Sequence, residues 1–584
     1  MRESANTTVD ETMQQRERRV RALVSFFEPA LVSVYFWWAI CLTCAAIFDL
    51  SDRHNLTPDG LSYLDMATEA LRSGPAALLN GLWSPAYPAL LSLALAIFHP
   101  SPDQEIPLAY FLNFLVFALT LWAFTFFLRQ WLAYADTLGL SSDRYKRYFV
   151  PFAFCTFLLF MLQDSNLRSV HPDLLAAAIV FFAAGLTCRI SVPGSSIRHF
   201  VTLGLALGIG YYAKAALFPL GLIFLSGLLI YPPSRQVSRK KLLLSLSVFL
   251  LVAAPLAICL CEQAGHFTLG EGSKLNYVWH VNETEPWLDL MGPHAVNPVH
   301  PPRRLMESPL ILEFGSPVKG TVPLWYDPAY WYAGGSVRFH LGRQVAAIES
   351  NLEEYREICD QWRVFFGGAV VLWILAACST WFSNIRRAAW IFAWPLIAMS
   401  MYALVHVEYR YVAAFCVLLC LATYGVLVPR VNTQVAMAVC ATVAGAMFIP
   451  FVGNMVVVTG QTVKDLLRPQ KPSYEIIALG LRDLGVKDGD SVAVVGWPFG
   501  PTFAHYGRLR VVAAIMGTDQ FWNLSPLELK SVMHSLTGAG IKAVVAKDRP
   551  RNSTPANWHD IKISDSNRYS VLLLSEPPPK DSVN

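Results

Sequence analysis

The segment WSPAYPALLSLALAIF, residues 83–98, is apolar but shorter than an ordinary transmembrane helix. A helix that crosses a bilayer needs roughly 20 mainly apolar residues. The segment begins with two prolines, Pro85 and Pro88, and is followed directly by His99 and Pro100. Every crossing helix moves the next loop to the opposite side of the membrane, so the placement of this segment fixes the sidedness of everything after it.

The composition of the whole chain is that of an integral membrane protein. Of the 584 residues, 54% are hydrophobic and only 15% are charged, and the mean hydropathy is +0.40. A soluble chain normally carries about 25% charged residues. The composition therefore excludes a soluble globular enzyme and predicts a chain surrounded largely by membrane lipid.

Hydrophobic runs predict about eleven transmembrane helices. Runs long enough to span a bilayer occupy residues 29–48, 107–128, 242–260, 364–381, 388–405, 411–429 and 435–458. Shorter runs, which need their neighbours to cover the membrane thickness, occupy residues 148–163, 174–188, 200–213 and 215–230.

Basic residues indicate which side each loop faces. With a cytoplasmic N-terminal tail, and with 83–98 as a re-entrant or surface-lying helix, the inner loops hold Arg129, Arg144, Lys146, Arg147, Arg189, Arg198, Arg235, Arg239, Lys240, Lys241, Arg386, Arg387 and Arg430. The short outer loops hold little beyond Arg53, Arg72, Arg168, Lys214 and Arg410. This asymmetry follows the positive-inside rule, and it would fail along the chain if residues 83–98 crossed.

The chain divides into three predicted domains. Residues 1–24 form a basic cytoplasmic tail, 25–461 a transmembrane domain and 462–584 an extracytoplasmic domain. The transmembrane domain includes a first outer loop with juxtamembrane helices, 49–106, and a large outer loop, 262–363.

The C-terminal domain has the pattern of an α/β fold. Buried strands are predicted at residues 491–497, 509–515 and 541–547, and helices at 473–485 and 525–540. The second helix begins with a capping box formed by Ser525 and Glu528. Strands that alternate with helices favour a small α/β domain.

The predicted topology brings the unusual polar residues to the outer face. The outer loops and helix ends hold Asp59, Arg168, His171, Asp173, Lys214, His406, Glu408 and Arg410. Charged groups near the ends of transmembrane helices are costly to bury and tend to line a site or cavity. The convergence of several loops predicts a functional site on this face.

Asp59 has two interpretations. It follows Pro58 and precedes Leu61, Leu64 and Leu71 at helical spacing, which is typical of the N-cap of an interfacial helix. It also has the chemistry of a general base. The two roles are compatible, because a helix N-terminus keeps a carboxylate ionised.

The other residues also have structural explanations. Lys214 fits a snorkelling interface anchor, and His171 and His406 lack the spacing of a zinc site. The acidic and basic residues of the outer loops could pair with one another to hold the loops together. The aromatic run LWYDPAYWYAGG, residues 324–335, fits a belt at the lipid interface or a platform for a sugar or lipid head group.

Five segments together resemble the GT-C glycosyltransferases, integral membrane enzymes that use polyprenyl-phosphate-linked sugars. In chain order they are PDGLSYLDMA (58–67), WSPAYPALLSLAL (83–95), SVHPDLLAAA (169–178), GIGYYAKAALFP (208–219) and HVEYRYVAAF (406–415). The resemblance covers residues 29–430 and is greatest to the branch of the protein O-mannosyltransferases and the lipid A aminoarabinose transferase. With the hydropathy pattern, it implies a polytopic α-helical membrane protein with a GT-C-like fold, a large extracytoplasmic loop and a C-terminal extracytoplasmic α/β domain.

The resemblance also assigns roles to individual residues. It implies that Asp59 is the catalytic base and that Lys214, Arg410 and Arg168 bind the donor phosphate. One carboxylate suffices here where a glycosidase needs two, because a polyprenyl phosphate leaves without protonation. The residues expected to contact substrate are Tyr63, Trp83, Tyr87, His171, Asp173, His406, Glu408, Trp325 and Tyr326.

Two positions depart from the family pattern. Many relatives carry an acidic pair in the first loop, whereas here Gly60 follows Asp59. The aminoarabinose branch carries a Glu-Lys pair where this chain has Trp83 and Ser84. A divalent metal ion is compatible with the resemblance, but we assign no metal ligand and no other cofactor.

The predicted function is a hexosyl or pentosyl transferase that moves a sugar from a polyprenyl-phosphate donor to a lipid, glycan or protein. The reaction would take place on the extracytoplasmic face of the cell membrane, with membrane lipid and the donor as partners and no nucleic acid. A lipid or glycan transporter or flippase, and a catalytically inactive GT-C-like scaffold, are the alternatives. A transporter needs charged residues near the bilayer middle and paired broken helices, whereas these charges lie at the outer rim.

Overall fold

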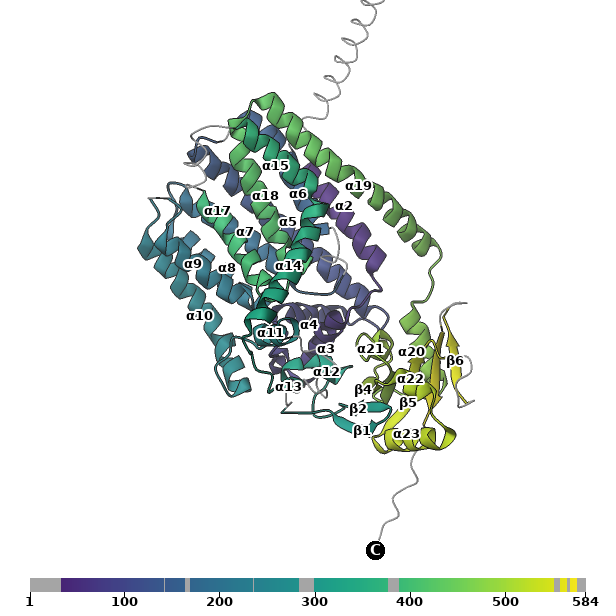
Figure 1. The fold of residues 1–584 in the computed structure, drawn as a ribbon. Coiled ribbons are helices and arrows are strands. Elements are labelled where there is room, and N and C mark those ends of the chain that lie inside the picture. The colour runs from purple at the N-terminus through teal and green to yellow at the C-terminus, as the bar shows by residue number, and fades with distance from the viewer. Residues whose placement is uncertain are drawn as a thin grey trace, which may run out of the picture.

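The computed structural model describes residues 33–140, 142–162, 169–234, 236–282, 299–376, 388–550, 557–563 and 568–574. Within these residues, long helices form a bundle that makes up most of the chain, and an α/β unit lies at one end of it (Figure 1). The arrangement follows from the hydropathy pattern, since the apolar runs form the bundle and the less apolar C-terminal segment forms the unit with strands.

The bundle consists of helices that overlap the transmembrane segments predicted above. They are α2 (Val34–Asp52), α5 (Glu105–Thr137), α6 (Asp143–Leu162), α7 (Asp173–Ser191), α8 (Ile197–Ala213), α9 (Leu217–Ile230), α10 (Arg239–Ala264), α15 (Arg363–Leu375), α17 (Ala389–Ala403), α18 (Tyr409–Leu427) and α19 (Thr433–Leu467). A short 3-10 turn, η3 (Val428–Arg430), separates the last two.

Not all of these helices pass a strict test for a membrane span. Among the described residues, 7 helices are long and apolar enough, and the number is 8 if α14 (Leu341–Gln361) and α15, which meet at 76°, form one broken span. Helices α9 and α17 are apolar but shorter. The polytopic helical fold is thus confirmed, and the count of about eleven spans stays a prediction.

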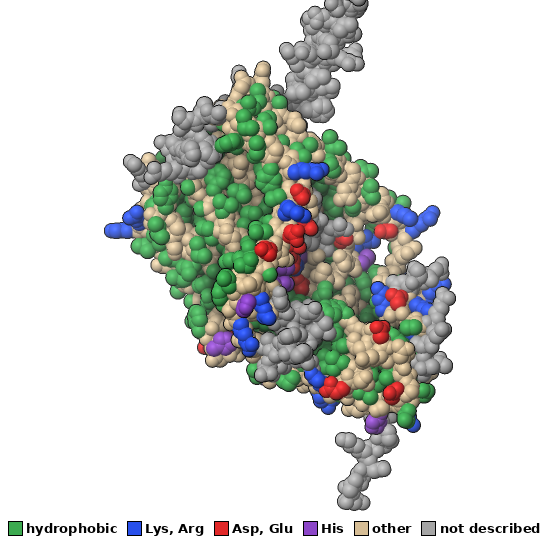
Figure 2. All heavy atoms as spheres, viewed as in Figure 1, with side chains coloured by type: hydrophobic (Ala, Val, Ile, Leu, Met, Phe, Trp, Pro, Cys, Tyr) green, Lys and Arg blue, Asp and Glu red, His purple; other side chains and the backbone are tan. Residues whose placement is uncertain are grey.

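The outer surface of the bundle is apolar. On α10, for example, the side chains of Leu243, Leu251 and Ile258 are 52%, 73% and 56% exposed. On the face drawn in Figure 2, hydrophobic side chains cover most of the bundle, and charged side chains gather along α14 and around the α/β unit. A continuous apolar surface of this kind marks contact with lipid or protein rather than with water.

The first outer loop folds into helices that pack together. Helix α3 (Pro58–Ser73) is followed by η1 (Pro75–Leu78) and α4 (Ala86–Phe98), and α4 packs against α3 and α5. With 13 residues, α4 falls short of the roughly 20 that a span requires. Its length favours the non-crossing interpretation of residues 83–98.

The C-terminal α/β domain is confirmed and extends further than expected. The predicted strands are β3 (Ser491–Val495), β4 (Arg510–Ile515) and β5 (Ile541–Lys547), which pair in parallel, and the predicted helices are α20 (Ser473–Asp483) and α23 (Pro526–Gly538). Ser525 and Glu528 form the expected capping box. The sheet also contains strands that the sequence analysis did not predict, so that its order is β1-β2-β4-β3-β5-β7-β6.

The unexpected strands come partly from the large outer loop. Strands β1 (Arg303–Glu307) and β2 (Leu310–Glu313) belong to that loop and join the sheet antiparallel to β4. Strands β6 (His559–Lys562) and β7 (Arg568–Leu573) close the opposite edge. The remaining helices of these segments are α11 (Gly272–His280), α12 (Pro323–Tyr326), α13 (Pro328–Trp331), α21 (Thr502–Tyr506) and α22 (Thr518–Trp522).

A hydrophobic core joins the α/β unit to the first outer loop. Buried side chains of α3 and α4, such as Leu64 and Tyr87, belong to the same cluster as Phe314, Val492 and Phe503. Helix α3 is therefore packed between the bundle and the C-terminal domain, and this position decides what can reach Asp59.

Candidate active site

A cavity of about 520 Å³ lies where several helix ends meet. Its polar lining comes from α3, the turn before α7, the end of α8, α11 and the start of α18. The polar and aromatic lining residues are Asp59, Tyr63, Trp83, Ser84, His171, Asp173, Lys214, Asn276, Tyr402, His406, Arg410 and Tyr411. Apolar residues, among them Pro219, Leu269, Met401 and Val405, line the rest.

Asp59 lies in the first turn of α3 with both carboxylate oxygens engaged. Oδ2 accepts a hydrogen bond from Arg410 Nη2 at 3.1 Å, and Oδ1 accepts one from Trp325 Nε1 at 3.3 Å. The side chain is 25% exposed. A carboxylate held from both sides in this way has a fixed direction toward the cavity.

The expectation that Asp59 caps α3 is wrong. The N-cap is Thr57, whose hydroxyl oxygen accepts a hydrogen bond from the backbone N–H of Gly60 at 3.2 Å. Pro58 occupies the first helical position, which proline favours because its missing N–H would have no helical partner. Asp59 therefore has no capping role, and its two hydrogen bonds go to side chains of other segments.

Arg410 is the centre of the charged groups. Besides Asp59, its guanidinium binds Glu408 through Nε, and the same nitrogen lies 3.8 Å from Asp173 Oδ2. It also lies 5.2 Å from the centroid of the Tyr411 ring. Arg410 at the start of α18 thus connects the first outer loop to the start of α7.

Lys214 follows the last residue of α8 and binds Asp173 from the other side. Its ammonium forms an ion pair with Asp173 Oδ1 and lies 3.4 Å from the centroid of the Tyr411 ring. Burial lowers the pKa of Lys214 below its ordinary value, although the nearby carboxylates oppose this shift. The ammonium group is thus held in a poorly hydrated place, where its attraction for an added anion is stronger than it would be in water.

The remaining charged and imidazole groups surround these two cations. His171 Nδ1 lies 3.1 Å from Asp173 Oδ2, and His406 Nε2 lies 3.3 Å from Glu408 Oε1. Burial raises the pKa of Glu408, but the bonds from His406 and Arg410 outweigh it and lower that pKa well below its ordinary value. His406 also stacks on His280 of α11, with ring centroids 3.8 Å apart.

The predicted aromatic contacts divide into two groups. Tyr63 and Trp83 line the cavity, and Trp325 lies beside Asp59 and packs edge-on against Trp83 at 5.6 Å. Tyr87 is fully buried and its hydroxyl donates to Asn113 Oδ1 at 2.5 Å. Tyr326 is also absent from the cavity lining, and its backbone carbonyl accepts a hydrogen bond from Asn80.

One predicted phosphate ligand, Arg168, lies outside the described residues. The sequence analysis in turn missed Tyr402, Tyr411, Ser84 and Asn276, which line the cavity. Tyr411 could have been found, because it directly follows Arg410 in the HVEYRY segment. Tyr402 and Asn276 carry no such signal, because neither is next to a charged residue in the sequence.

The packing around position 60 explains why this residue is a glycine. A Cβ atom at this position would lie 2.9 Å from Leu56 Cδ1, 3.0 Å from Val170 Cβ and 3.1 Å from the carbonyl oxygen of Val170. Helix α3 therefore approaches the turn before α7 so closely that a side chain at position 60 would force Leu56 and Val170 to shift. An acidic side chain at position 60, which the family resemblance would lead us to expect beside Asp59, is larger still and would need a greater shift.

The described residues contain no group of three His, Cys, Asp or Glu side chains placed to hold a metal ion. The cations Lys214 and Arg410 instead supply positive charge in the cavity. The site as described can thus hold an anion through side chains alone.

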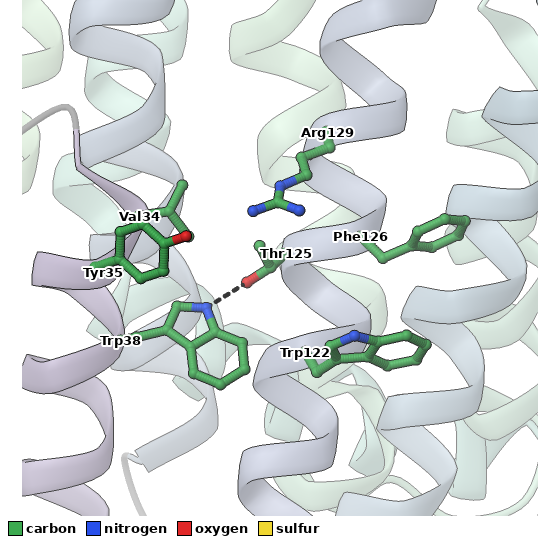
Figure 3. A pocket seen from close by; sticks show the side chains of 7 residues that line it. All are labelled: Val34, Tyr35, Trp38, Trp122, Thr125, Phe126 and Arg129. Atoms are coloured by element: carbon green, nitrogen blue, oxygen red, sulfur yellow. Dashed lines mark hydrogen bonds between the residues drawn. The ribbon is translucent and has the colours of Figure 1, made fainter.

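A second cavity lies between α2 and α5 and contains none of the predicted site residues. It measures about 210 Å³ and is lined by Val34, Tyr35, Trp38, Trp122, Thr125, Phe126 and Arg129. Trp38 Nε1 donates to Thr125 Oγ1 at 2.9 Å, and Arg129 is the only charged lining residue (Figure 3). With no carboxylate in its lining, this cavity offers no general base.

Comparison with known proteins gives a match in fold. No protein-family model and no curated protein matches the sequence. The crystal structure of ArnT from Cupriavidus metallidurans in the apo state is 13% identical in sequence, covers 94% of this chain and 100% of its own, and has a TM-score of 0.51. The chain therefore has a fold like that of ArnT, a lipid A aminoarabinose transferase, which confirms the expected GT-C-like fold.

Two further solved structures are more distant. ArnT from the same organism bound to undecaprenyl phosphate is 13% identical, covers 93% of this chain and 99% of its own, and has a TM-score of 0.41. The oligosaccharyltransferase of Archaeoglobus fulgidus in the apo form is 12% identical, covers 87% of this chain and 69% of its own, and has a TM-score of 0.48. Neither match is close enough to carry an argument about this chain.

Proposed function

We propose that this protein is a glycosyltransferase that moves a sugar from a polyprenyl-phosphate-linked donor to an acceptor, with Asp59 as the general base. The observation that carries the proposal is the cavity in which Lys214 and Arg410 lie next to a fixed carboxylate, Asp59. Cations in a poorly hydrated cavity suit a phosphate group, and the apolar part of the lining suits a lipid chain. The likeness in fold to ArnT supports the same class of reaction.

The donor phosphate would bind between Lys214 and Arg410. Lys214 is already paired with Asp173, and Arg410 with Asp59, Asp173 and Glu408, so three carboxylates face two cations. A phosphate must therefore compete with these carboxylates for the cations. When it does so, Arg410 exchanges part of its bond to Asp59 for the phosphate, and Asp59 gains a free oxygen.

In the transfer step, an acceptor oxygen or nitrogen attacks the anomeric carbon of the donor sugar. The bond from the acceptor atom to this carbon forms as the bond from the carbon to the phosphate oxygen breaks. The acceptor proton moves to Asp59, and the polyprenyl phosphate leaves as an anion stabilised by Lys214 and Arg410. Trp325 donates to the other oxygen of Asp59 and so keeps the base aimed at the acceptor.

The test is the binding of a lipid phosphate. Undecaprenyl phosphate should bind the purified protein in lipid nanodiscs, and Lys214→Ala and Arg410→Ala should each weaken this binding. A charge-assisted hydrogen bond is worth roughly 1.5–3 kcal/mol, which corresponds to about ten- to hundredfold in affinity. Arg129→Ala is the matched control, because it removes a cation from the second cavity and should leave the affinity unchanged.

Sugar transfer is then measured with a panel of polyprenyl-phosphate sugars and with lipids that copurify with the protein, identified by mass spectrometry. Equal affinity in wild type, Lys214→Ala and Arg410→Ala would contradict the phosphate site. Tight binding without transfer of any sugar would favour the transporter or the inactive scaffold over the enzyme.

A further inference from the structure

Four charged side chains connect the C-terminal domain to helix α3, away from the cavity. These four residues, Asp65, Glu105, His505 and Arg508, are referred to as the α3 latch. His505 Nδ1 lies 3.1 Å from Asp65 Oδ1, and His505 Nε2 lies 3.1 Å from Glu105 Oε2. Arg508 binds both oxygens of Glu105, one of them at 3.1 Å. One imidazole of α21 thus joins α3 to α5.

The latch is shielded from water. His505 is 3% exposed, and the side chains of Asp65 and Glu105 are 9% and 8% exposed. Burial lowers the pKa of His505, but the hydrogen bonds to the two carboxylates outweigh it and raise that pKa to about 9. The imidazole is therefore charged at neutral pH and donates from both nitrogens.

Asp65 also fixes the segment that carries Trp325. The carboxylate of Asp65 accepts hydrogen bonds from the backbone N–H of Thr321 at 2.6 Å and from its hydroxyl at 2.9 Å. Thr321 lies shortly before Trp325, which donates to Asp59. The hydroxyl of Ser62 on α3 donates to the Trp325 carbonyl at 2.9 Å. Asp59 is therefore held both through α3 and through the Trp325 segment, and Asp65 anchors both.

The C-terminal domain also touches this segment directly. Phe499, in the loop after β3, packs edge-on against Trp325 with ring centroids 5.5 Å apart. Gly500 lies close to Pro58, because a Cβ atom on it would be 3.7 Å from Pro58 Cγ. The domain thus reaches α3 both at the latch and next to Asp59.

We propose that His505 is a positioning residue of the transfer reaction, which holds Asp65 and thereby fixes the place of Asp59 relative to the bound donor. The proposal rests on the proposed function. Asp59 and Asp65 are six residues apart on α3, or about 9 Å along the helix axis, so α3 moves as one unit when its anchor is released. A displacement of about 1 Å at a reacting group can lower a rate about a hundredfold.

Two isosteric variants separate positioning from general stability. In His505→Asn the amide nitrogen occupies the place of Nδ1 and can still donate to Asp65, whereas in His505→Gln it occupies the place of Nε2 and can donate only to Glu105. Both variants lose the same charge and one bond. Lys319→Ala is the control, because it removes the exposed ion pair between Lys319 and Glu69 of α3, a pair of the kind that contributes little.

The three variants are compared by thermal unfolding, by hydrogen exchange in the peptide 58–73, by undecaprenyl phosphate binding and by sugar transfer. We expect similar unfolding midpoints for His505→Asn and His505→Gln, but faster exchange in α3 for His505→Gln. We also expect His505→Gln to have about tenfold lower kcat than His505→Asn, with lipid phosphate affinity unchanged, because Lys214 and Arg410 lie on other helices. Lys319→Ala should resemble wild type in all four measurements.

Equal kcat values in His505→Asn and His505→Gln, or equal exchange in α3, would overturn the proposal. If neither variant folds, hydrogen exchange in the wild-type protein provides the test. When the pH is raised from 7.5 to above 9, exchange in α3 should increase by more than the intrinsic exchange rate does. An increase no larger than the intrinsic one would overturn the proposal. The failure of the proposed function would look different, because wild type would then bind no lipid phosphate and transfer no sugar while the exchange results still held.

Discussion

The two charged clusters on either side of helix α3 contain the same kinds of groups in different proportions. At the cavity, the carboxylates Asp59, Asp173 and Glu408 pair with the two cations Lys214 and Arg410. His171 and His406 lie beside two of these carboxylates. In the α3 latch, two carboxylates face the charged His505 and Arg508. The charges of the latch are balanced, whereas the described part of the cavity cluster has one more carboxylate than it has Lys and Arg side chains and lies at a cavity of about 520 Å³.

This difference separates a structural ion cluster from a binding site. A buried cluster whose charges are matched fixes the geometry of the segments that it joins, because separating any partner would leave a buried charge unpaired. Arg410 has three carboxylate neighbours, so a ligand can replace one of them without leaving its charge unpaired. We therefore expect the latch to fix the orientation of α3 and the cavity cluster to exchange a carboxylate for a ligand.

The largest effect should come from Asp59→Asn. The amide oxygen can still accept the bond from Trp325, but the group can no longer take up a proton. We expect a loss of about 10²–10⁴-fold in transfer rate, measured as kcat with a saturating donor. Affinity for undecaprenyl phosphate should be retained or increased, because Arg410 loses its tie to Asp59.

Asp65→Asn is the matched comparison, since it neutralises a carboxylate on the same helix but in the latch. It should lower the unfolding midpoint more than Asp59→Asn does. A stable Asp59→Asn protein with wild-type transfer would remove the catalytic role of Asp59 and with it the contrast between the clusters.

The next effect concerns the pH dependence of stability. Because the folded state raises the pKa of His505 from its ordinary value to about 9, the protonated latch stabilises the fold. This contribution is fully present below about pH 6.5 and is lost as pH rises through about 9, and its size is about 3 kcal/mol. Thermal unfolding midpoints of wild type should fall between pH 7 and pH 9.5.

His505→Asn is the control for this titration, because it has no titratable side chain at position 505 while every other titratable group is kept. Its midpoint should be lower at pH 7 and nearly constant up to pH 9.5. If the unfolding midpoint fell by the same amount in wild type and in His505→Asn, the titrating group would be another residue. His505 would then not carry the charge assigned to the latch.

Much of the fold could be predicted from the sequence, because its elements depend on local patterns. The apolar runs predicted the helices of the bundle, and the strands predicted at 491–497 and 541–547 form the centre of the sheet. Strands β1 and β2 could not be found, since RRLME (303–307) is largely polar and pairs only with β2, which in turn gains its place in the sheet from β4. Thr57 was missed as the N-cap because Asp59 is an equally good capping residue, and only the helix position of Pro58 separates the two.

The site was predictable in part for a different reason. Asp59, Asp173, Lys214 and Arg410 meet because the topology brings their helix ends to one face, and topology follows from hydropathy and charge. The latch has no such signal. Asp65 and His505 are separated by 440 positions, and the helix α21 that carries His505 has only 5 residues, too few to show a pattern.

A smaller effect should follow from Gly60→Ala, which tests how closely the cavity cluster is packed. The added methyl group would meet Leu56 and Val170 at 2.9–3.1 Å, and such overpacking costs about 1–3 kcal/mol, partly offset by the better helix propensity of alanine, about 1 kcal/mol. We expect a small loss of stability and a larger loss of transfer rate, because α3 shifts at the end that carries Asp59. A rate equal to that of wild type would mean that the position of this helix end does not limit the reaction. Gly445→Ala is the control, because Gly445 lies in α19 with open space around the added methyl group. Gly74→Ala is unsuitable, because Gly74 has a φ of 97°.

The smallest effect should come from Thr57→Ala, which loosens only the first turn of α3. Loss of an N-cap costs about 1 kcal/mol, and here it removes the hydrogen bond to the N–H of Gly60 while Pro58 still favours the helix start. The latch lies further along the helix and holds α3 through Asp65, so the helix should stay in place and only the Asp59 turn should fray. Hydrogen exchange should therefore rise in residues 58–61 but not in residues 65–73, and transfer should fall only about two- to threefold. If exchange rose along the whole of α3 instead, the cap and the latch would hold the helix jointly, and the two clusters would act as one mechanical unit. Substitutions of His505 and Thr57 should then have non-additive effects in the double variant.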